Sequence, residues 1–250
     1  GGSAVGGGAD LYAANESSPS AQPSATGANA VVIGDSAVAS GSKSIALGYK
    51  ATATANFATA FAESRAAGEY SFAAGIANDS TTYGASAAYS ISIGYQSRAK
   101  AGQSVALGSS AYVDSDSNRG LALGENAYVQ QCDYGTAIGV ASRVHGGNSA
   151  TEAIAIGSSY ASGTSSFAAA IANNTSTYGA QGANSVAIGQ ITKATGTNSI
   201  MIGKYGHASG LGSVAIDAAT NSASGTANAS GTFSIVIGSS AATEQRSVAF

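Results

Sequence analysis

The sequence has little charge, few aromatic residues and no long hydrophobic run. Charged residues make up 9% and aromatic residues 7% of its 250 residues, and tryptophan is absent. The formal net charge of −3 gives no basic balance that would favour a nucleic acid backbone or an anionic membrane. No apolar run approaches the roughly 18 residues that a membrane-spanning helix needs. We therefore expect no nucleic acid partner and no direct insertion of this segment into a membrane.

Cysteine and proline are almost absent as well. The single cysteine, Cys132, excludes a disulfide within the chain, and we interpret it as a small packed residue. Both prolines, Pro19 and Pro23, lie in residues 1–26, whose Gly, Ser and Ala content predicts a tether or linker. From Gly27 onward there is no proline. This suits strands in continuous ladders, because proline lacks the N–H group that pairs.

What the sequence does contain is one short phrase, repeated many times. Residues 184–189 read NSVAIG, and residues 198–203, fourteen positions later, read NSIMIG. Similar phrases recur along the chain, mostly at intervals close to this one and in a few places at longer intervals. A nearly fixed period of this kind predicts a repeat architecture.

Each repeat holds two short alternating segments separated by a glycine. In SIAL the alternation has a period of two, which predicts a strand with Ile45 and Leu47 on one face. A second alternation follows at residues 51–54, and Gly48 between the two supplies a turn. Two strands of four or five residues and two turns would close one flat coil. Residues 27–250 are therefore predicted to be all-β, forming a parallel β-solenoid of about 14-residue repeats.

The lumen of such a coil must be narrow, because the positions that face it are nearly all Ala, Ser or Gly. The branched residues must then point outward and form one apolar stripe along the solenoid. A stripe of that size is not expected on a soluble monomer, so another copy of the chain should cover it. The predicted interface residues are Ile45, Leu47, Ile91, Ile93, Val105, Leu107, Ile154, Ile156, Val186, Ile188, Ile200, Ile202, Ile235 and Ile237.

The repeats SIALGYKATATA (44–55), SVALGSSAYVDS (104–115) and SVAIGQITKATG (185–196) resemble the head domains of trimeric autotransporter adhesins, the YadA-like heads. The resemblance implies a left-handed parallel β-roll in which three chains form a homotrimer. It also implies a non-enzymatic, extracellular head at the bacterial cell surface that attaches to a host cell, matrix or other surface. Similar repeats occur in phage tail fibres, so a virion protein for host recognition is the alternative.

A longer internal repeat lies within this pattern. Residues 72–94 match residues 167–189, and in both segments the interval between successive phrases is longer than in the ordinary repeat. We therefore expect longer insertions near 76–90 and 171–185. Their tyrosines, Tyr83 and Tyr178, either clamp a neighbouring chain or belong to solvated decorations. The last repeat is cut at Phe250, and we expect more protein beyond it.

The second alternation of several repeats carries tyrosines and basic residues at its outward positions. Stacked on successive coils, they would form a ridge suited to the faces of sugars or to acidic glycans, with a host surface glycan or matrix protein as the partner. The alternative is a tyrosine ladder that only shields the backbone. The candidate ligand-binding residues are Arg98, Lys100, Tyr112, Tyr128, Arg143 and His145, with Asp114 also placed outward.

No signature of catalysis stands out in the sequence. There is no P-loop, no nucleophile elbow and no pair of carboxylates at catalytic spacing, so we predict neither an enzyme nor a cofactor. Asp114, Asp116 and Asn118 partly match a calcium loop, but Arg119 stands where glycine is required, and no metal site is predicted. An ice-binding solenoid is a remote alternative. It would need a regular threonine column, and the arginine, tyrosine and histidine residues break that column.

Overall fold

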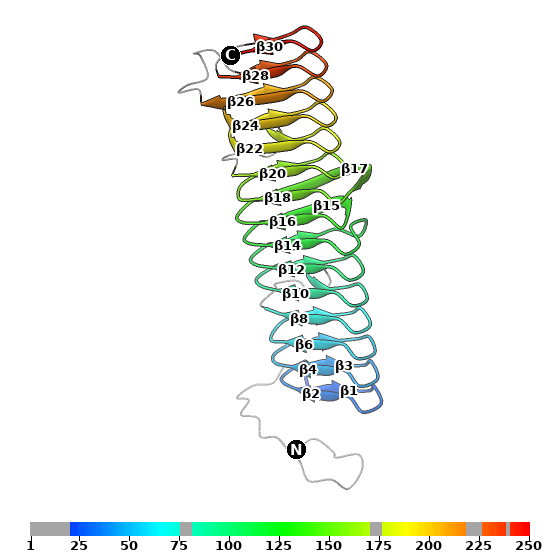
Figure 1. The fold of residues 1–250 in the computed structure, drawn as a ribbon. Helices are drawn as coiled ribbons and strands as arrows, with labels where there is room; N and C mark the ends of the chain where they lie inside the picture. Colours follow the sequence, from blue (N-terminus) through cyan, green and yellow to red (C-terminus); the bar gives the residue numbers. More distant parts are fainter. Residues whose placement is uncertain (1–20, 76–81, 171–176, 219–226, 239–240) are drawn as a thin grey trace. The chain divides into compact units, whose positions relative to one another are not determined.

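The computed structural model describes residues 21–75, 82–170, 177–218, 227–238 and 241–250. The chain divides into two compact units, Gly1–Ser110 and Ala111–Phe250. The described parts of both units consist of short parallel strands joined by turns, and they contain no helix (Figure 1).

In the first unit the chain passes alternately through two parallel sheets. Each strand pairs with the strand one coil later, as Val31 does with Ile45 and Val38 with Thr52. Sheet A contains β1 (Ser24–Ala25), β3 (Val38–Ala39), β5 (Thr52–Ala53), β7 (Arg65–Ala66), β9 (Gly84–Ala85) and β11 (Arg98–Ala99). Sheet B contains β2 (Val31–Ile33), β4 (Ile45–Leu47), β6 (Thr59–Phe61), β8 (Phe72–Ala74), β10 (Ile91–Ile93) and β12 (Val105–Leu107).

The second unit shows the same alternation. Its sheet A strands are β13 (Tyr112–Val113), β15 (Tyr128–Asp133), β17 (Arg143–Thr151), β19 (Tyr160–Ala161), β21 (Gly179–Ala180), β23 (Lys193–Ala194), β25 (His207–Ala208), β27 (Asn228–Ala229) and β29 (Ala241–Ala242). Its sheet B strands are β14 (Leu121–Leu123), β16 (Thr136–Ile138), β18 (Ile154–Ile156), β20 (Phe167–Ala169), β22 (Val186–Gln190), β24 (Ile200–Lys204), β26 (Val214–Ala218), β28 (Ile235–Ile237) and β30 (Val248–Ala249).

Two neighbouring strands of the second unit are longer than the rest. β15 spans six residues and β17 nine, and both continue past the point where the other strands of sheet A end. Their pairing is interrupted by a register shift between Gln130 and Cys132, after which Asp133 pairs with Thr151. The bulge extends this pair of strands beyond the edge of the coil, as Figure 1 shows for β15 and β17.

The turns depend on left-handed backbone. Gly48 has φ of 119°, and a Cβ added to it would lie 2.8 Å from the Cα of Ala62 on the next coil, so this turn requires glycine. At the other corner of each coil, one residue adopts φ near 57°, and in most coils this residue is not glycine. Lys43 (56°) and Asn198 (57°) are examples. We call this position, two residues before each strand of sheet B, the corner column.

Alanine fills the lumen between the two sheets. Ala46 of sheet B faces the lumen together with Ala51 and Ala53 of the following segment, and all three side chains are 0% exposed. The serine that precedes each sheet B strand is also buried in most coils, and the hydroxyl of Ser44 donates to the Gly41 carbonyl at 2.7 Å. The sheets are held so close together that alanine and serine fill these positions in most coils.

In the second unit larger residues enter the lumen, and beside several of them a neighbour is reduced to glycine. Val113, Val129 and Val144 are fully buried at the position that alanine takes in other coils. A Cβ added to Gly135, which stands in place of the usual serine, would lie 2.7 Å from Val129 Cγ1 and 3.1 Å from Val144 Cγ1. The extra volume of the valines is thus offset by the missing side chain of the glycine.

The predicted all-β solenoid of about 14-residue repeats is confirmed. The predicted strand length of four or five residues is wrong for most of the chain, because the strands of sheet A are typically two residues long and those of sheet B three. β1 already pairs with β3 at Ser24 and Ala25, within the residues that the sequence assigned to the tether. Residues 1–20 lie outside the described part of the chain.

Candidate functional site

The apolar stripe lies on the outer face of sheet B. Every side chain predicted for it is partly exposed, whereas the residues between them are buried in the lumen. In the first unit Ile91 and Ile93 are 37% and 39% exposed, and in the second unit Ile202 and Ile237 are 39% and 44% exposed. The prediction that these branched residues point away from their own coil is correct.

Within the stripe, large and small outward side chains alternate between neighbouring strands. Where β6 carries Phe61 at one outward position, Thr59 stands at the other, and β8 reverses the order with Phe72 and Ala74. Phe61 and Phe72 then fill the diagonal, with ring centroids 5.7 Å apart. At these coils of the first unit the stripe is therefore a packed surface rather than a set of isolated apolar residues.

The predicted ligand ridge divides between the two units. Arg98 and Lys100 belong to the first unit and are half-buried. The guanidinium carbon of Arg98 lies 5.3 Å from the ring centroid of Tyr83, so this arginine packs on the tyrosine of the first predicted insertion. Gly84 pairs with Arg98 on the adjacent strand, so the residue beside Arg98 on that coil has no side chain.

In the second unit Tyr112, Tyr128 and Arg143 form a column on the outer face of sheet A. Tyr112 pairs with Tyr128, and their ring centroids are 5.0 Å apart with the planes tilted by 39°. Tyr128 pairs with Arg143, whose guanidinium carbon lies 5.0 Å from the Tyr128 ring centroid. The column ends at Tyr160, which is 8% exposed. We name Tyr112, Tyr128 and Arg143 the tyrosine column.

His145 lies beside the tyrosine column. It pairs with Gln130 on β15, where the two long strands begin to extend past the coil, and both side chains are half-buried. This part of the surface therefore offers aromatic edges, a guanidinium group, an imidazole and an amide together. Such a set can donate hydrogen bonds to hydroxyl and carboxylate oxygens of a ligand.

Asp114 does not point outward, and the prediction that placed it on the ridge is wrong. Its side chain is 6% exposed, and Oδ1 accepts hydrogen bonds from the Ser117 hydroxyl at 2.8 Å and the Asp116 backbone N–H at 3.0 Å. The Gln131 backbone N–H donates to the same oxygen at 3.3 Å. The carboxylate therefore closes a turn and anchors it to the next coil. Within the described ranges no three His, Cys, Asp or Glu side chains are grouped to hold a metal ion.

The two predicted insertions begin in residues 76–81 and 171–176, which lie outside the described part of the chain. The longer circuits are visible in the pairing, since Phe72 pairs with Ile91 and Phe167 with Val186, both separations being longer than the ordinary repeat. Tyr83 packs on Arg98 of its own chain, and the Tyr178 carbonyl accepts from Gln181 Nε2 at 3.5 Å. Whether either tyrosine also touches a neighbouring chain stays a prediction.

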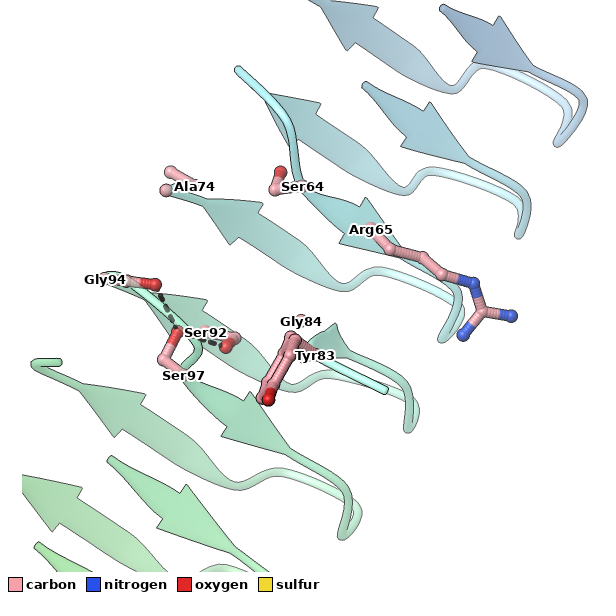
Figure 2. Close-up of a pocket in the computed structure, with 9 residues that line it drawn as sticks. Ser64, Arg65, Ala74, Tyr83, Gly84, Ser92, Gly94 and Ser97 are labelled. Carbon is pink, nitrogen blue, oxygen red and sulfur yellow. Dashed lines mark hydrogen bonds between the residues drawn. The ribbon is translucent and has the colours of Figure 1, made fainter. Parts of the chain in front are cut away.

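A small pocket lies where the first long circuit rejoins the solenoid (Figure 2). Its serine hydroxyl groups are bonded to one another or to the backbone: the Ser92 and Ser97 hydroxyl oxygens are 2.7 Å apart, and Ser64 Oγ donates to the Ala73 carbonyl at 2.9 Å. These bonds use the serine hydroxyls, so Arg65 and Tyr83 supply the remaining polar side chains of the lining. The pocket is lined by Ser64, Arg65, Ala74, Gly75, Tyr83, Gly84, Ser92, Gly94 and Ser97.

The sequence did not predict a second aromatic surface, which lies at the corner column of the first unit. Phe57, Tyr70 and Tyr89 follow one another there on successive coils, and their rings stack. The alternation of polar and apolar residues does not identify these three aromatic residues, because they lie between the two alternating segments of each repeat. Aligning the repeats on the left-handed corner residue would have brought the three together.

The comparisons with known proteins agree with this architecture. Residues 25–51, 39–61, 85–111, 180–205 and 225–241 match the family model described as the YadA head domain repeat. A search of curated proteins found no match. In the part of the chain that the structure describes, no helix is long and apolar enough to cross a membrane. Segments of the chain thus match YadA head repeats, and its described parts form a β-solenoid, which is consistent with a YadA-like head.

Proposed function

We propose that this chain, with its YadA head repeats, is part of the head of a trimeric adhesin that attaches to a host cell, to matrix or to another surface. The head would be extracellular and would carry out no chemistry. The observation that carries the proposal is the apolar stripe on sheet B, combined with the repeat family that the chain matches.

The stripe supports a homotrimer because the chain cannot bury it alone. The lumen of the first unit is filled mostly by alanine and serine, and Ser92 already takes the inward position between Ile91 and Ile93. Covering a side chain that is about 40% exposed stabilises an assembly by on the order of 1 kcal/mol. The contributions add along the stripe, and a symmetric assembly satisfies every copy of the chain at once.

The tyrosine column supports the attachment surface. Tyr112, Tyr128 and Arg143 lie on sheet A, on the side of the coil opposite the stripe, so a trimer that covers sheet B leaves them accessible. Aromatic edges beside a guanidinium group suit a glycan that carries carboxylates. Three copies on one head would raise the avidity of a weak site through effective concentration.

The first experiment tests the trimer by sedimentation equilibrium of the purified chain. We expect three copies per particle, and we expect Ile91→Lys to shift the population toward monomer because it places a charge in the covered stripe. Thr52→Lys, on the outer face of sheet A, is the matched control and should leave the assembly unchanged. A parent chain that stays monomeric at all concentrations would contradict the proposal.

The second experiment tests attachment by binding of the assembled chain to an array of neutral and acidic glycans. Replacing both Tyr112 and Tyr128 by Ala should abolish binding to the recognised glycan without changing the assembly. Tyr134→Ala is the control, since Tyr134 is an exposed tyrosine of the same unit outside the tyrosine column. Unchanged binding by the double variant would remove this surface as the attachment site, while the trimer would stand or fall on the first experiment.

A further inference from the structure

The aromatic residues at the corner column of the first unit form a flat stack, which we name the aromatic ledge. The ring centroids of Phe57 and Tyr70 are 4.6 Å apart with planes 5° from parallel, and those of Tyr70 and Tyr89 are 5.1 Å apart with planes 6° from parallel. At one end Lys43 Nζ lies 5.0 Å from the Phe57 ring centroid. The ledge therefore consists of three rings, closed at one end by a cation.

The fold does not require aromatic residues at these positions. Asparagine adopts left-handed backbone more readily than other residues with a side chain, and Asn29, Asn184 and Asn198 occupy the same column on other coils. The three rings are 38%, 47% and 56% exposed, so much of their apolar surface is not used to stabilise the coil. Three consecutive rings at a corner that accepts polar residues elsewhere point to a role outside the fold.

The geometry of the ledge determines what it can bind. Neighbouring rings cover the inner faces of the stack and Lys43 lies over the outer face of Phe57, so a sugar, which stacks on a ring face, finds at most the outer face of Tyr89. The ring edges form a strip roughly 10 Å long, given the spacing of about 4.8 Å between strands. These edges carry the positive part of the aromatic quadrupole, and Lys43 adds a full positive charge at one end.

We propose that the aromatic ledge binds a flat, elongated aromatic ligand that carries an anionic group at one end. The ligand lies along the stack across the ring edges of Phe57, Tyr70 and Tyr89, with its anion beside Lys43. A rigid ligand loses little conformational freedom when it binds to an open strip, whereas a flexible peptide would have to be ordered along its whole length.

The probe that tests the proposal is 4-(phenylazo)benzoate, a rigid planar molecule with one carboxylate, together with its uncharged carboxamide. Binding to the assembled parent chain is measured by isothermal titration calorimetry. The triple variant Phe57→Asn, Tyr70→Asn, Tyr89→Asn keeps a residue suited to the left-handed corner and removes the rings. We expect it to lose at least about tenfold in affinity for the benzoate.

Two further variants make the test specific. Phe233→Asn is the matched control, since Phe233 occupies the corner column of the second unit with φ of 55° and is 51% exposed. It should leave the affinity unchanged. Lys43→Asn should remove the preference for the benzoate over the carboxamide while the carboxamide still binds.

Several outcomes overturn the proposal. They are a parent chain that does not bind the benzoate, a triple variant that binds it as the parent does, and a control that loses as much affinity as the triple variant. If the triple variant changes the oligomeric state, the ledge is a contact between chains and the proposal is also overturned. If the triple variant does not fold, Tyr70→Asn alone, which interrupts the stack at its centre, decides between the same outcomes.

Discussion

Met201 and Gly206 share one volume in the lumen of the second unit. Met201 is fully buried at a position that Ala46 takes in the first unit, and a Cβ added to Gly206 would overlap the Met201 thioether. In the coil that contains Ala46, the residue that corresponds to Gly206 is Ala51. One methionine and one glycine thus replace two alanines, and the side chain of Met201 extends into the space that a methyl group would fill.

This relationship predicts that the two positions are strongly coupled. Gly206→Ala should destabilise the chain by about 1 to 3 kcal/mol because it overfills a closed lumen. Met201→Ala should cost about 2 to 5 kcal/mol because it leaves a cavity. The double variant restores the usual pair of alanines and should cost much less than the sum. Urea denaturation of the four proteins measures the coupling, and additive losses would show that the side chains do not share the space.

The sequence predicts the coil well because the forces that form it are local and repeated. Ile45 and Leu47 alternate with Ala46, and because the small residue takes the inward position, the direction of every side chain in this strand follows. The same reasoning applied to Val113 or Met201 would have placed these residues in the lumen, since they occupy the inward positions of their alternation. Val113 and Met201 are larger than the alanines at these positions in other coils, which argues against placing them in the lumen. The structure shows that they fit because Gly120 lies beside Val113 and Gly206 beside Met201.

A second prediction concerns the valines of the lumen. Gly135→Ser places the usual serine at its usual position, yet we expect a loss of about 1 to 3 kcal/mol because an added Cβ would lie 2.7 Å from Val129 Cγ1. The same change combined with Val129→Ala should recover most of the loss. The midpoint of urea denaturation checks both variants, and a stable Gly135→Ser single variant would show that the lumen can expand here.

The features that the sequence did not predict depend on how coils stack rather than on one coil. Asp114 is buried because the next coil brings the backbone N–H group of Gln131 to its carboxylate. The aromatic ledge exists because Phe57, Tyr70 and Tyr89, which are unevenly spaced along the chain, are aligned by the pairing of coils of unequal length. The alternation within one repeat predicts neither the contact of Asp114 with the next coil nor the alignment of the three rings.

A third prediction separates two buried serines of the same column. The hydroxyl of Ser104 donates to the Ala101 carbonyl at 2.6 Å, whereas Ser71 Oγ is buried without a hydrogen-bond partner. Ser104→Ala should cost about 1 kcal/mol, and Ser71→Ala should be neutral or stabilising because it removes a polar atom that is buried unpaired. Thermal denaturation of the two variants checks the difference. Equal losses would mean that Ser71 is as well bonded as Ser104.

The last prediction concerns the dependence of stability on pH. The pKa of His207 is lowered from its ordinary value of 6.5, first by burial and then by the charge of Lys193 on the adjacent strand. His207 Nε2 lies 2.9 Å from Thr195 Oγ1, and Asn228 pairs with His207 on its other side. The folded chain therefore holds this imidazole neutral at a pH where the unfolded chain already binds a proton.

The sign follows from that difference in proton binding. Well above pH 6.5 both states are neutral at His207, so its contribution is fully present. As the pH falls through this value the unfolded state gains protons first, and stability decreases until the folded pKa is passed. Between about pH 7.5 and 5.5 the parent should lose more stability than His207→Asn, which cannot titrate. Urea denaturation at both pH values measures the loss, and equal losses in the two proteins would assign the effect to other groups.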